Sequence, residues 1–279
     1  MQTSRVPYLA IWVLAVILCA CGGDKSPRAR LEKTRNLASQ EKFEKALSEL
    51  RPLITGQPTD SAVLILAAKV YFGLEKYDSA HYFAKQYAML YPTRLDGYHM
   101  LYMTGEKVKN YDDQIWAVSQ LGYLENDRRK YHVEIAQLNF LRGEYGMAMK
   151  TCEMVFEYDP NNTAALFVMA NSLATIGQLD SAIGIMERLD KQNPNQVEIL
   201  SNLASFFVSK RDYQQAIAHF QRLTTLFPDY LPGWYGLGNV LLQAGDTAAA
   251  KDAYGQVYRR DSTFLGVDSI YRHLNRGIY

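Results

Sequence analysis

The stretch AALFVMANSLATIGQLDSAIGIMERLDKQNP, residues 164–194, contains two short apolar patterns with a break between them. The apolar residues are Leu166, Met169, Ala170 and Leu173, then Leu179, Ala182, Ile183, Met186 and Leu189. Intervals of three and four positions are typical of an amphipathic helix. Asn193-Pro194 ends the second pattern, because proline lacks an amide hydrogen and keeps the preceding residue out of the helical conformation. The stretch predicts a helix, a turn over residues 175–178 and a second helix.

The same pattern returns every 34 residues along the chain. Prolines end the units at Pro58, Pro92, Pro160, Pro194 and Pro228, with Asn126 where one is missing. Alanines mark the second helices at Ala46, Ala80, Ala148, Ala182, Ala216 and Ala250, with Gln114 in the gap. Small residues mark the first helices at Ala68, Ala136, Ala170, Ala204 and Gly238, with Thr34 and Tyr102 as exceptions. These columns predict a stack of helix pairs, because no single pair can bury its apolar face.

The columns resemble the tetratricopeptide repeat (TPR), a helix-turn-helix unit of 34 residues. The resemblance runs from about Pro27 to Phe264 and covers nearly all of the chain after its first twenty residues. It implies an all-α fold, a right-handed α-solenoid of about seven units, which we assign to residues 27–60, 61–94, 95–128, 129–162, 163–196, 197–230 and 231–264. Residues 265–279 carry Val267, Ile270, Tyr271 and Leu274 at helical spacing and predict a C-terminal capping helix.

The third unit departs from the pattern in three columns at once, at Tyr102, Gln114 and Asn126. Two large side chains stand where two small ones meet in the other units. One interpretation is a wider gap between the helices, or a hinge in the array. The other is compensated packing, with a hydrogen bond between Tyr102 and Gln114.

The first twenty residues read as a lipoprotein signal peptide. The apolar run from Tyr8 to Leu18 is too short to span a bilayer. Leu18-Cys19-Ala20 precedes Cys21 in an order that resembles the bacterial lipobox, which implies cleavage before Cys21 and lipidation of that residue. Residues 21–26 then form a short tether, and we expect the protein in the bacterial cell envelope, periplasmic or at the cell surface, more at the outer than the inner membrane. An ordinary secretory signal or an uncleaved anchor is the alternative.

The charge of the chain is balanced. The 279 residues carry a formal net charge of +1, and removal of residues 1–20 takes away only Arg5 among the charged residues, leaving 29 basic and 29 acidic side chains. Because phosphate backbones require a concentrated positive field, this balance argues against nucleic acid as a partner.

The reactive residues do not form a recognisable active site. The five histidines fall in different units without a metal-binding spacing, Cys152 takes a second-helix core position, and Asp112-Asp113 stands at a helix start, where acids are favourable. Gly236 and Gly238 lack the third glycine of a dinucleotide fingerprint. We therefore expect no enzyme, no cofactor and no metal.

The TPR resemblance implies a partner peptide or helix in a groove lined by the first helices. The floor positions are Arg35, Lys69, Met103, Gln137, Asn171, Ser205 and Asn239, and the flanking ones are Ile65, Phe72, His99, Phe140, Phe167 and Tyr235. Some family members grip a carboxylate with two asparagines and cations. Asn171 and Asn202 match the asparagines, but Phe167, Pro232 and Gly236 take the cation positions, so this clamp lacks its charge.

A second contact site is predicted at Tyr82 and Trp116, which share an outward column of the second helices. Together these features predict a membrane-anchored protein–protein interaction scaffold or assembly adaptor outside the cytoplasm, with Cys21 acylated in the bilayer. The alternatives are a lipoprotein that binds carbohydrate or peptidoglycan, and a noncatalytic subunit of an envelope enzyme complex.

Overall fold

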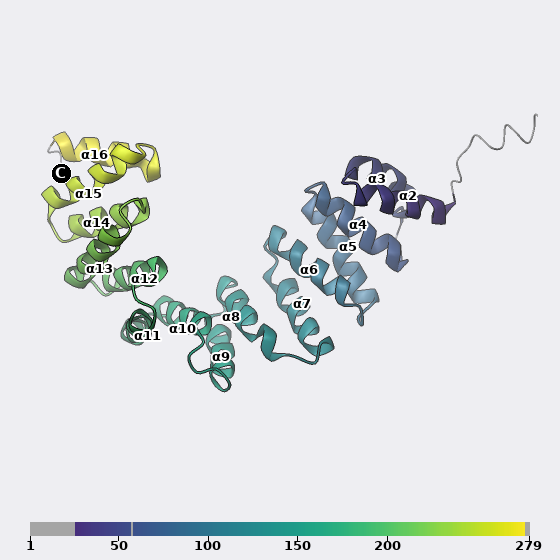
Figure 1. The fold of residues 1–279 in the computed structure, drawn as a ribbon, viewed down its shortest axis with the longest axis horizontal. Coiled ribbons are helices and arrows are strands. Elements are labelled where there is room, and N and C mark those ends of the chain that lie inside the picture. The colour runs from purple at the N-terminus through teal and green to yellow at the C-terminus, as the bar shows by residue number, and fades with distance from the viewer. Residues whose placement is uncertain (1–25, 57, 277–279) are drawn as a thin grey trace, which may run out of the picture. The chain divides into compact units, whose positions relative to one another are not determined.

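A computed structural model of the protein describes residues 26–56 and 58–276. Within these ranges the chain contains fifteen α-helices and three short 3₁₀ helices, and no β-strand (Figure 1). The helices follow one another as helix-turn-helix pairs with one final helix. The predicted all-α solenoid with a capping helix is confirmed.

The chain divides into two compact units, one ending at Arg128 and the other beginning at Arg129. The first unit contains α2 (Pro27–Ser39), α3 (Phe43–Leu50), η1 (Arg51–Leu53), α4 (Ser61–Gly73), α5 (Tyr77–Leu90), α6 (Leu95–Val108) and α7 (Tyr111–Leu124). The second contains η2 (Arg129–Tyr131), α8 (His132–Leu141), α9 (Tyr145–Phe156), α10 (Thr163–Thr175), α11 (Leu179–Gln192), α12 (Val197–Ser209), α13 (Tyr213–Leu226), α14 (Leu231–Gln243), α15 (Thr247–Arg260), η3 (Phe264–Gly266) and α16 (Val267–Arg276). Within each unit, every helix contacts the next helix in the chain.

A left-handed residue lies at the turn inside every helix pair. These residues recur every 34 positions, at Glu41, Glu75, Lys109, Gly143, Gly177, Arg211 and Gly245. The amide of the following residue then reaches back to the first helix, as Gln178 N does to Leu173 O at 2.8 Å, and satisfies a carbonyl at the helix end. Glycine adopts this conformation at no steric cost, but four of the seven turns have a residue other than glycine at this position.

The small residues of the two helices lie in the core between them. Every alanine of the two columns is fully buried: Ala46, Ala68, Ala80, Ala136, Ala148, Ala170, Ala182, Ala204, Ala216 and Ala250. From α10 onward these alanines join a continuous apolar core that reaches from Leu166 on α10 to Leu274 on α16, whereas Ala136 and Ala148 belong to a separate cluster around α8 and α9. The short side chains therefore allow the close approach of antiparallel helices that stacking requires.

The divergent third repeat unit packs through a glycine one turn beyond Tyr102. A Cβ at Gly105 would lie 2.9 Å from Cγ of Gln114, so Gly105 provides the space that the larger side chain occupies. Gln114 is 3% exposed, and its amide donates a long hydrogen bond of 3.4 Å to Asn110 O. This contact favours the interpretation of compensated packing within α6 and α7.

The C-terminal end is closed by α16, whose apolar side lies on α15. Val267 and Leu274 are buried, and the ring of Tyr271 stacks on Tyr258 with centroids 4.9 Å apart. The opposite side of α16 is polar, as expected of a capping helix.

Candidate peptide-binding groove

The predicted floor positions lie one on each first helix. Arg35, Lys69, Met103, Gln137, Asn171, Ser205 and Asn239 belong in that order to α2, α4, α6, α8, α10, α12 and α14. All of them are exposed except Asn171, which is half-buried. First-helix side chains at this spacing are thus available to a partner in both units.

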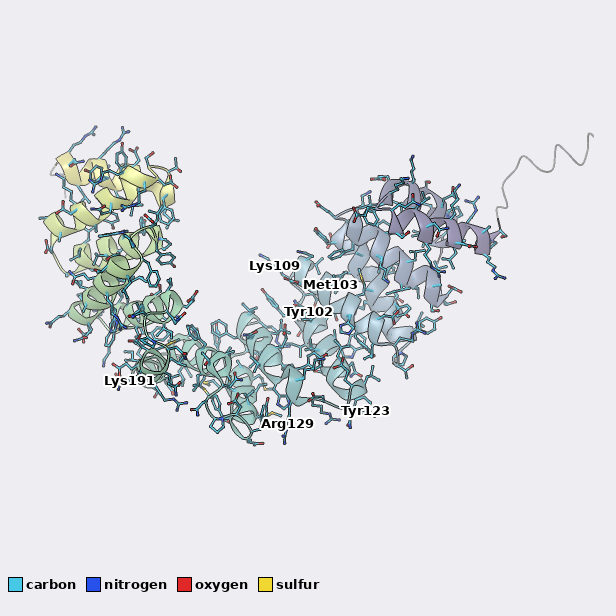
Figure 2. The ribbon with its side chains drawn as sticks, in the orientation of Figure 1. Tyr102, Met103, Lys109, Tyr123, Arg129 and Lys191 are labelled. Atoms are coloured by element: carbon cyan, nitrogen blue, oxygen red, sulfur yellow. The ribbon has the colours of Figure 1, made fainter. Side chains whose placement is uncertain are left out.

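In the first unit the predicted groove residues differ in exposure. Met103 is exposed on α6 (Figure 2). His99 is also exposed on α6, whereas Ile65 is half-buried on α4. Phe72 is also half-buried, because its ring packs edge-on against Tyr77 at 5.5 Å. None of these four residues lines a described pocket.

In the second unit a pocket of about 680 Å³ opens between α8, α10 and α12. It brings together four of the predicted groove residues: Gln137, Phe140, Phe167 and Asn171. The remaining lining residues are Thr163, Ala164 and Val168 of α10, Asn193 and Gln196 of the α11–α12 connection, and Glu198 and Ile199 of α12. This volume is in the range of sites that hold a ligand or a peptide side chain.

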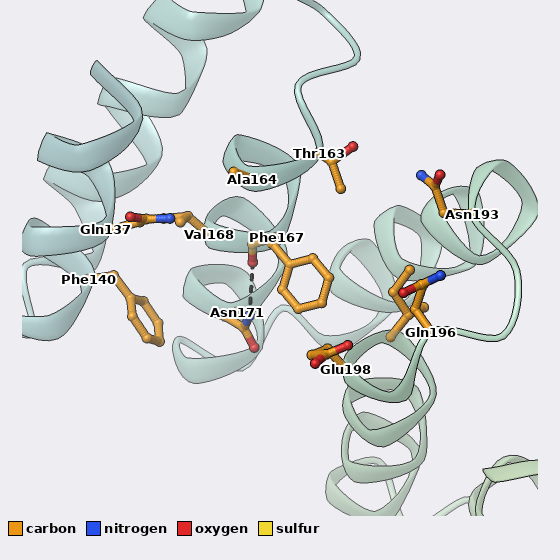
Figure 3. A pocket seen from close by; sticks show the side chains of 11 residues that line it. Gln137, Phe140, Thr163, Ala164, Phe167, Val168, Asn171, Asn193, Gln196 and Glu198 are labelled. Carbon is orange, nitrogen blue, oxygen red and sulfur yellow. Dashed lines mark hydrogen bonds between the residues drawn. The ribbon is translucent and has the colours of Figure 1, made fainter. Parts of the chain in front are cut away.

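The pocket combines aromatic surfaces with amide groups (Figure 3). Phe140 and Phe167 are half-buried, and Phe140 rests on Tyr145 with centroids 5.5 Å apart. The side-chain amide of Asn171 donates to Phe167 O at 3.0 Å, which orients its carbonyl oxygen as an acceptor. Amides beside apolar rings suit a peptide, because its backbone needs hydrogen bonds and its side chains need apolar contact.

Seven of the eleven lining residues were not predicted from the sequence, among them Asn193, Gln196 and Glu198. The resemblance placed the groove on first helices alone, whereas Asn193 and Gln196 belong to the connection that leads into α12. The only signal available was Asn193-Pro194, which was interpreted as a helix stop. The positions of the repeat pattern cannot show that the α11–α12 connection also lines the pocket.

Four further predicted residues lie outside this pocket. Asn202 is half-buried and Ser205 is exposed, both on α12. Tyr235 packs edge-on against Tyr254 at 5.6 Å and against Phe264 at 5.9 Å. The Asn239 side chain accepts a hydrogen bond of 2.6 Å from the Tyr254 hydroxyl. Tyr235 and Asn239 are therefore engaged in packing α14 against its C-terminal neighbours.

The outward aromatic pair is exposed at only one of its two positions. Tyr82 is 50% exposed on α5. Trp116 is half-buried on α7, because its ring packs perpendicular to the buried Tyr98 at 5.5 Å. The prediction of two exposed aromatic rings is therefore corrected: Tyr82 is exposed, and Trp116 is not.

The reactive side chains differ in burial. Cys152 is fully buried, and burial raises the pKa of its thiol to about 12, so it remains protonated. Asp112 is exposed, but Asp113 is 6% exposed and accepts hydrogen bonds from His81, Lys85 and Asn110. No cluster of three potential metal ligands occurs among residues 26–56 and 58–276.

Two sequence families with the description "Tetratricopeptide repeat" match the chain, one over residues 140–205 and the other over residues 201–265. Residues 140–265 are tetratricopeptide repeats. These matches indicate an interaction scaffold, and neither of them is an enzyme family.

Curated proteins resemble the chain in part. The general transcriptional corepressor trfA of Dictyostelium discoideum is 33% identical over 82 residues, which are 29% of this chain and 6% of that protein. The chain spans 6% to 15% of the length of the curated relatives it matches.

Solved structures, one of them described as a tetratricopeptide repeat protein, share the fold. A TPR protein from Parabacteroides merdae aligns with a TM-score of 0.58 and 11% identity, over 88% of this chain and 98% of that one. MamA from Desulfovibrio magneticus aligns with a TM-score of 0.54 and 15% identity, over 61% of this chain and 97% of that one. At these identities the similarity establishes the TPR fold alone.

Proposed function

We propose that this protein is a membrane-anchored TPR scaffold that binds a partner protein through a peptide segment in the pocket between α8, α10 and α12. The observation that carries the proposal is the pocket itself. It collects Gln137, Phe140, Phe167 and Asn171 from two successive first helices and adds the α11–α12 connection as a further wall. Aromatic side chains in a partly desolvated pocket are the typical centre of a protein interface.

The proposed anchor is an acylated Cys21, which would hold the scaffold at the extracytoplasmic side of a bacterial membrane. Cys21 and the whole signal peptide lie outside the described residues. The support is the lipobox-like order of residues 18–21 after a short apolar run. Two or more acyl chains on one residue anchor a protein stably in a bilayer. Among the helices in the described ranges, none is long and apolar enough to cross a membrane.

Combined substitution of Phe167, Asn171 and Asn202 by alanine tests the binding proposal. We expect weaker partner capture, measured by crosslinking pulldown from native membranes and mass spectrometry, with helicity preserved in circular dichroism. A control with Lys150→Ala and Glu187→Ala changes exposed second-helix residues only. Equal capture by the triple variant and the control would move the binding face away from the first helices.

A further inference from the structure

The first helices of the second unit are depleted of positive charge. α8, α10, α12 and α14 contain no lysine or arginine. Their only carboxylates are Glu134 and Glu198. His132, the one histidine among them, has its pKa lowered by burial, so its neutral form is favoured. The cations of this unit lie on the second helices, in the connections and on α16, so the four first helices themselves carry two carboxylates and no cationic side chain.

Glu198 is the charged residue of the pocket. It lies in the first turn of α12, is exposed, and makes no ion pair or hydrogen bond through its side chain among the residues that the structure describes. Its neighbours in the lining, Asn193 and Gln196, are neutral amides. The carboxylate is therefore available to a cation brought by a partner.

The apolar part of the pocket lies beside this carboxylate. Figure 3 shows the Phe167 ring between α10 and the start of α12, with Glu198 close to it and Phe140 on the side of α8. Ile199 follows Glu198 in the lining and is 2% exposed. An occupant that fills the pocket thus meets an apolar surface and a negative charge at neighbouring positions.

We propose that the pocket takes an extended peptide segment with a bulky apolar side chain against Phe140 and Phe167 and a lysine or arginine beside Glu198. This inference rests on the proposed function and specifies the chemistry of the partner. An acidic segment is disfavoured, because no cation on the four first helices would offset its charge. The Glu198 pair is solvent-exposed, so charge contributes a preference of about three- to tenfold rather than most of the affinity.

Selection from two randomised peptide pools tests the inference. The peptides are of about ten residues, which extend to roughly 33 Å, and the central residue is fixed as phenylalanine in one pool and as serine in the other. The full-length protein is compared with Glu198→Lys, Glu198→Gln and Phe167→Ala. Glu187→Lys is the matched control, since Glu187 is an exposed carboxylate on α11 outside the pocket lining.

For the wild type and Glu187→Lys we expect the phenylalanine pool to be retained, with lysine and arginine enriched about three- to tenfold over acids next to it. Glu198→Gln abolishes the enrichment, Glu198→Lys reverses it, and Phe167→Ala lowers retention of the whole pool. Retention of the phenylalanine pool with no charge preference, or with a preference that survives Glu198→Lys, overturns this inference and leaves the proposed groove standing. Equal retention of the two pools by the wild type contradicts both.

Discussion

At the scale of single residues, the glycines of α14 have separate packing roles. Gly238 lies opposite Tyr254, where an added Cβ would be 2.9 Å from the ring. Gly236 lies against Phe220, where the same addition would be 2.5 Å from the ring. Gly238 was predictable from its column of small residues. Gly236 was not predictable, because its neighbour Phe220 belongs to the preceding repeat. Packing therefore explains the glycine at this position, where family members that grip a carboxylate carry a cation.

We expect Gly236→Ala to lower the free energy of unfolding by about 1 kcal/mol. The clash with the buried Phe220 costs about 1–3 kcal/mol, and the better helix propensity of alanine returns up to about 1 kcal/mol. Gly184→Ala is the control on α11, where an added Cβ meets nothing within 4 Å. It should stabilise by about 0.5–1 kcal/mol. Urea unfolding measures both, and a Gly236→Ala protein more stable than the wild type by about 0.5–1 kcal/mol would show that Phe220 yields at no cost.

At the scale of elements, a buried carboxylate joins neighbouring helices of the first unit. The Asp113 carboxylate on α7 accepts hydrogen bonds from His81 Nε2 and Lys85 Nζ of α5, each at 2.9 Å. It accepts a third from Asn110 Nδ2 of the α6–α7 turn, at 3.0 Å. On its other side the His81 ring lies 3.1 Å from the hydroxyl of Thr104 on α6. These polar contacts fix how one helix pair sits on the next.

We expect Asp113→Ala to destabilise the first unit by about 3 kcal/mol, because the substitution leaves charged and polar partners without their acceptor. Asp112→Ala removes the adjacent, exposed carboxylate and should change the free energy of unfolding by less than about 0.5 kcal/mol. Denaturant unfolding compares the two variants. Similar losses for both would mean that the carboxylate acts only through its position at the helix start.

The helix pairs were predictable, and the connections were not. The alanine columns identified the contact between helices because every small residue falls in one register, as at Ala170 and Ala182. The left-handed turn column escaped notice, since Glu75 or Arg211 at such a position gives no glycine signal. The same limit applies to the candidate site, where Phe167 and Asn171 came from family positions but Asn193 and Glu198 required the spatial neighbours of α10.

At the scale of the whole molecule, the proposed anchor and the proposed groove can be tested independently of each other. Cys21→Ser should move the protein from the membrane to the soluble fraction, because the acyl chains would have no attachment site. Fractionation with immunoblotting measures the distribution, and Cys152→Ser is the cysteine control that should stay with the membrane. A Cys21→Ser protein that remains in the membrane fraction would favour an uncleaved anchor.

We propose that the first-helix face of the second unit binds a protein partner. A photo-crosslinking amino acid placed at Gln137, an exposed pocket residue on α8, tests it most directly in cells. The same group at Lys150, exposed on the second helix α9, is the matched control. We expect mass spectrometry to find a discrete protein adduct at position 137 and none at position 150. Adducts at position 150 alone, or the same adducts at both positions, would contradict it.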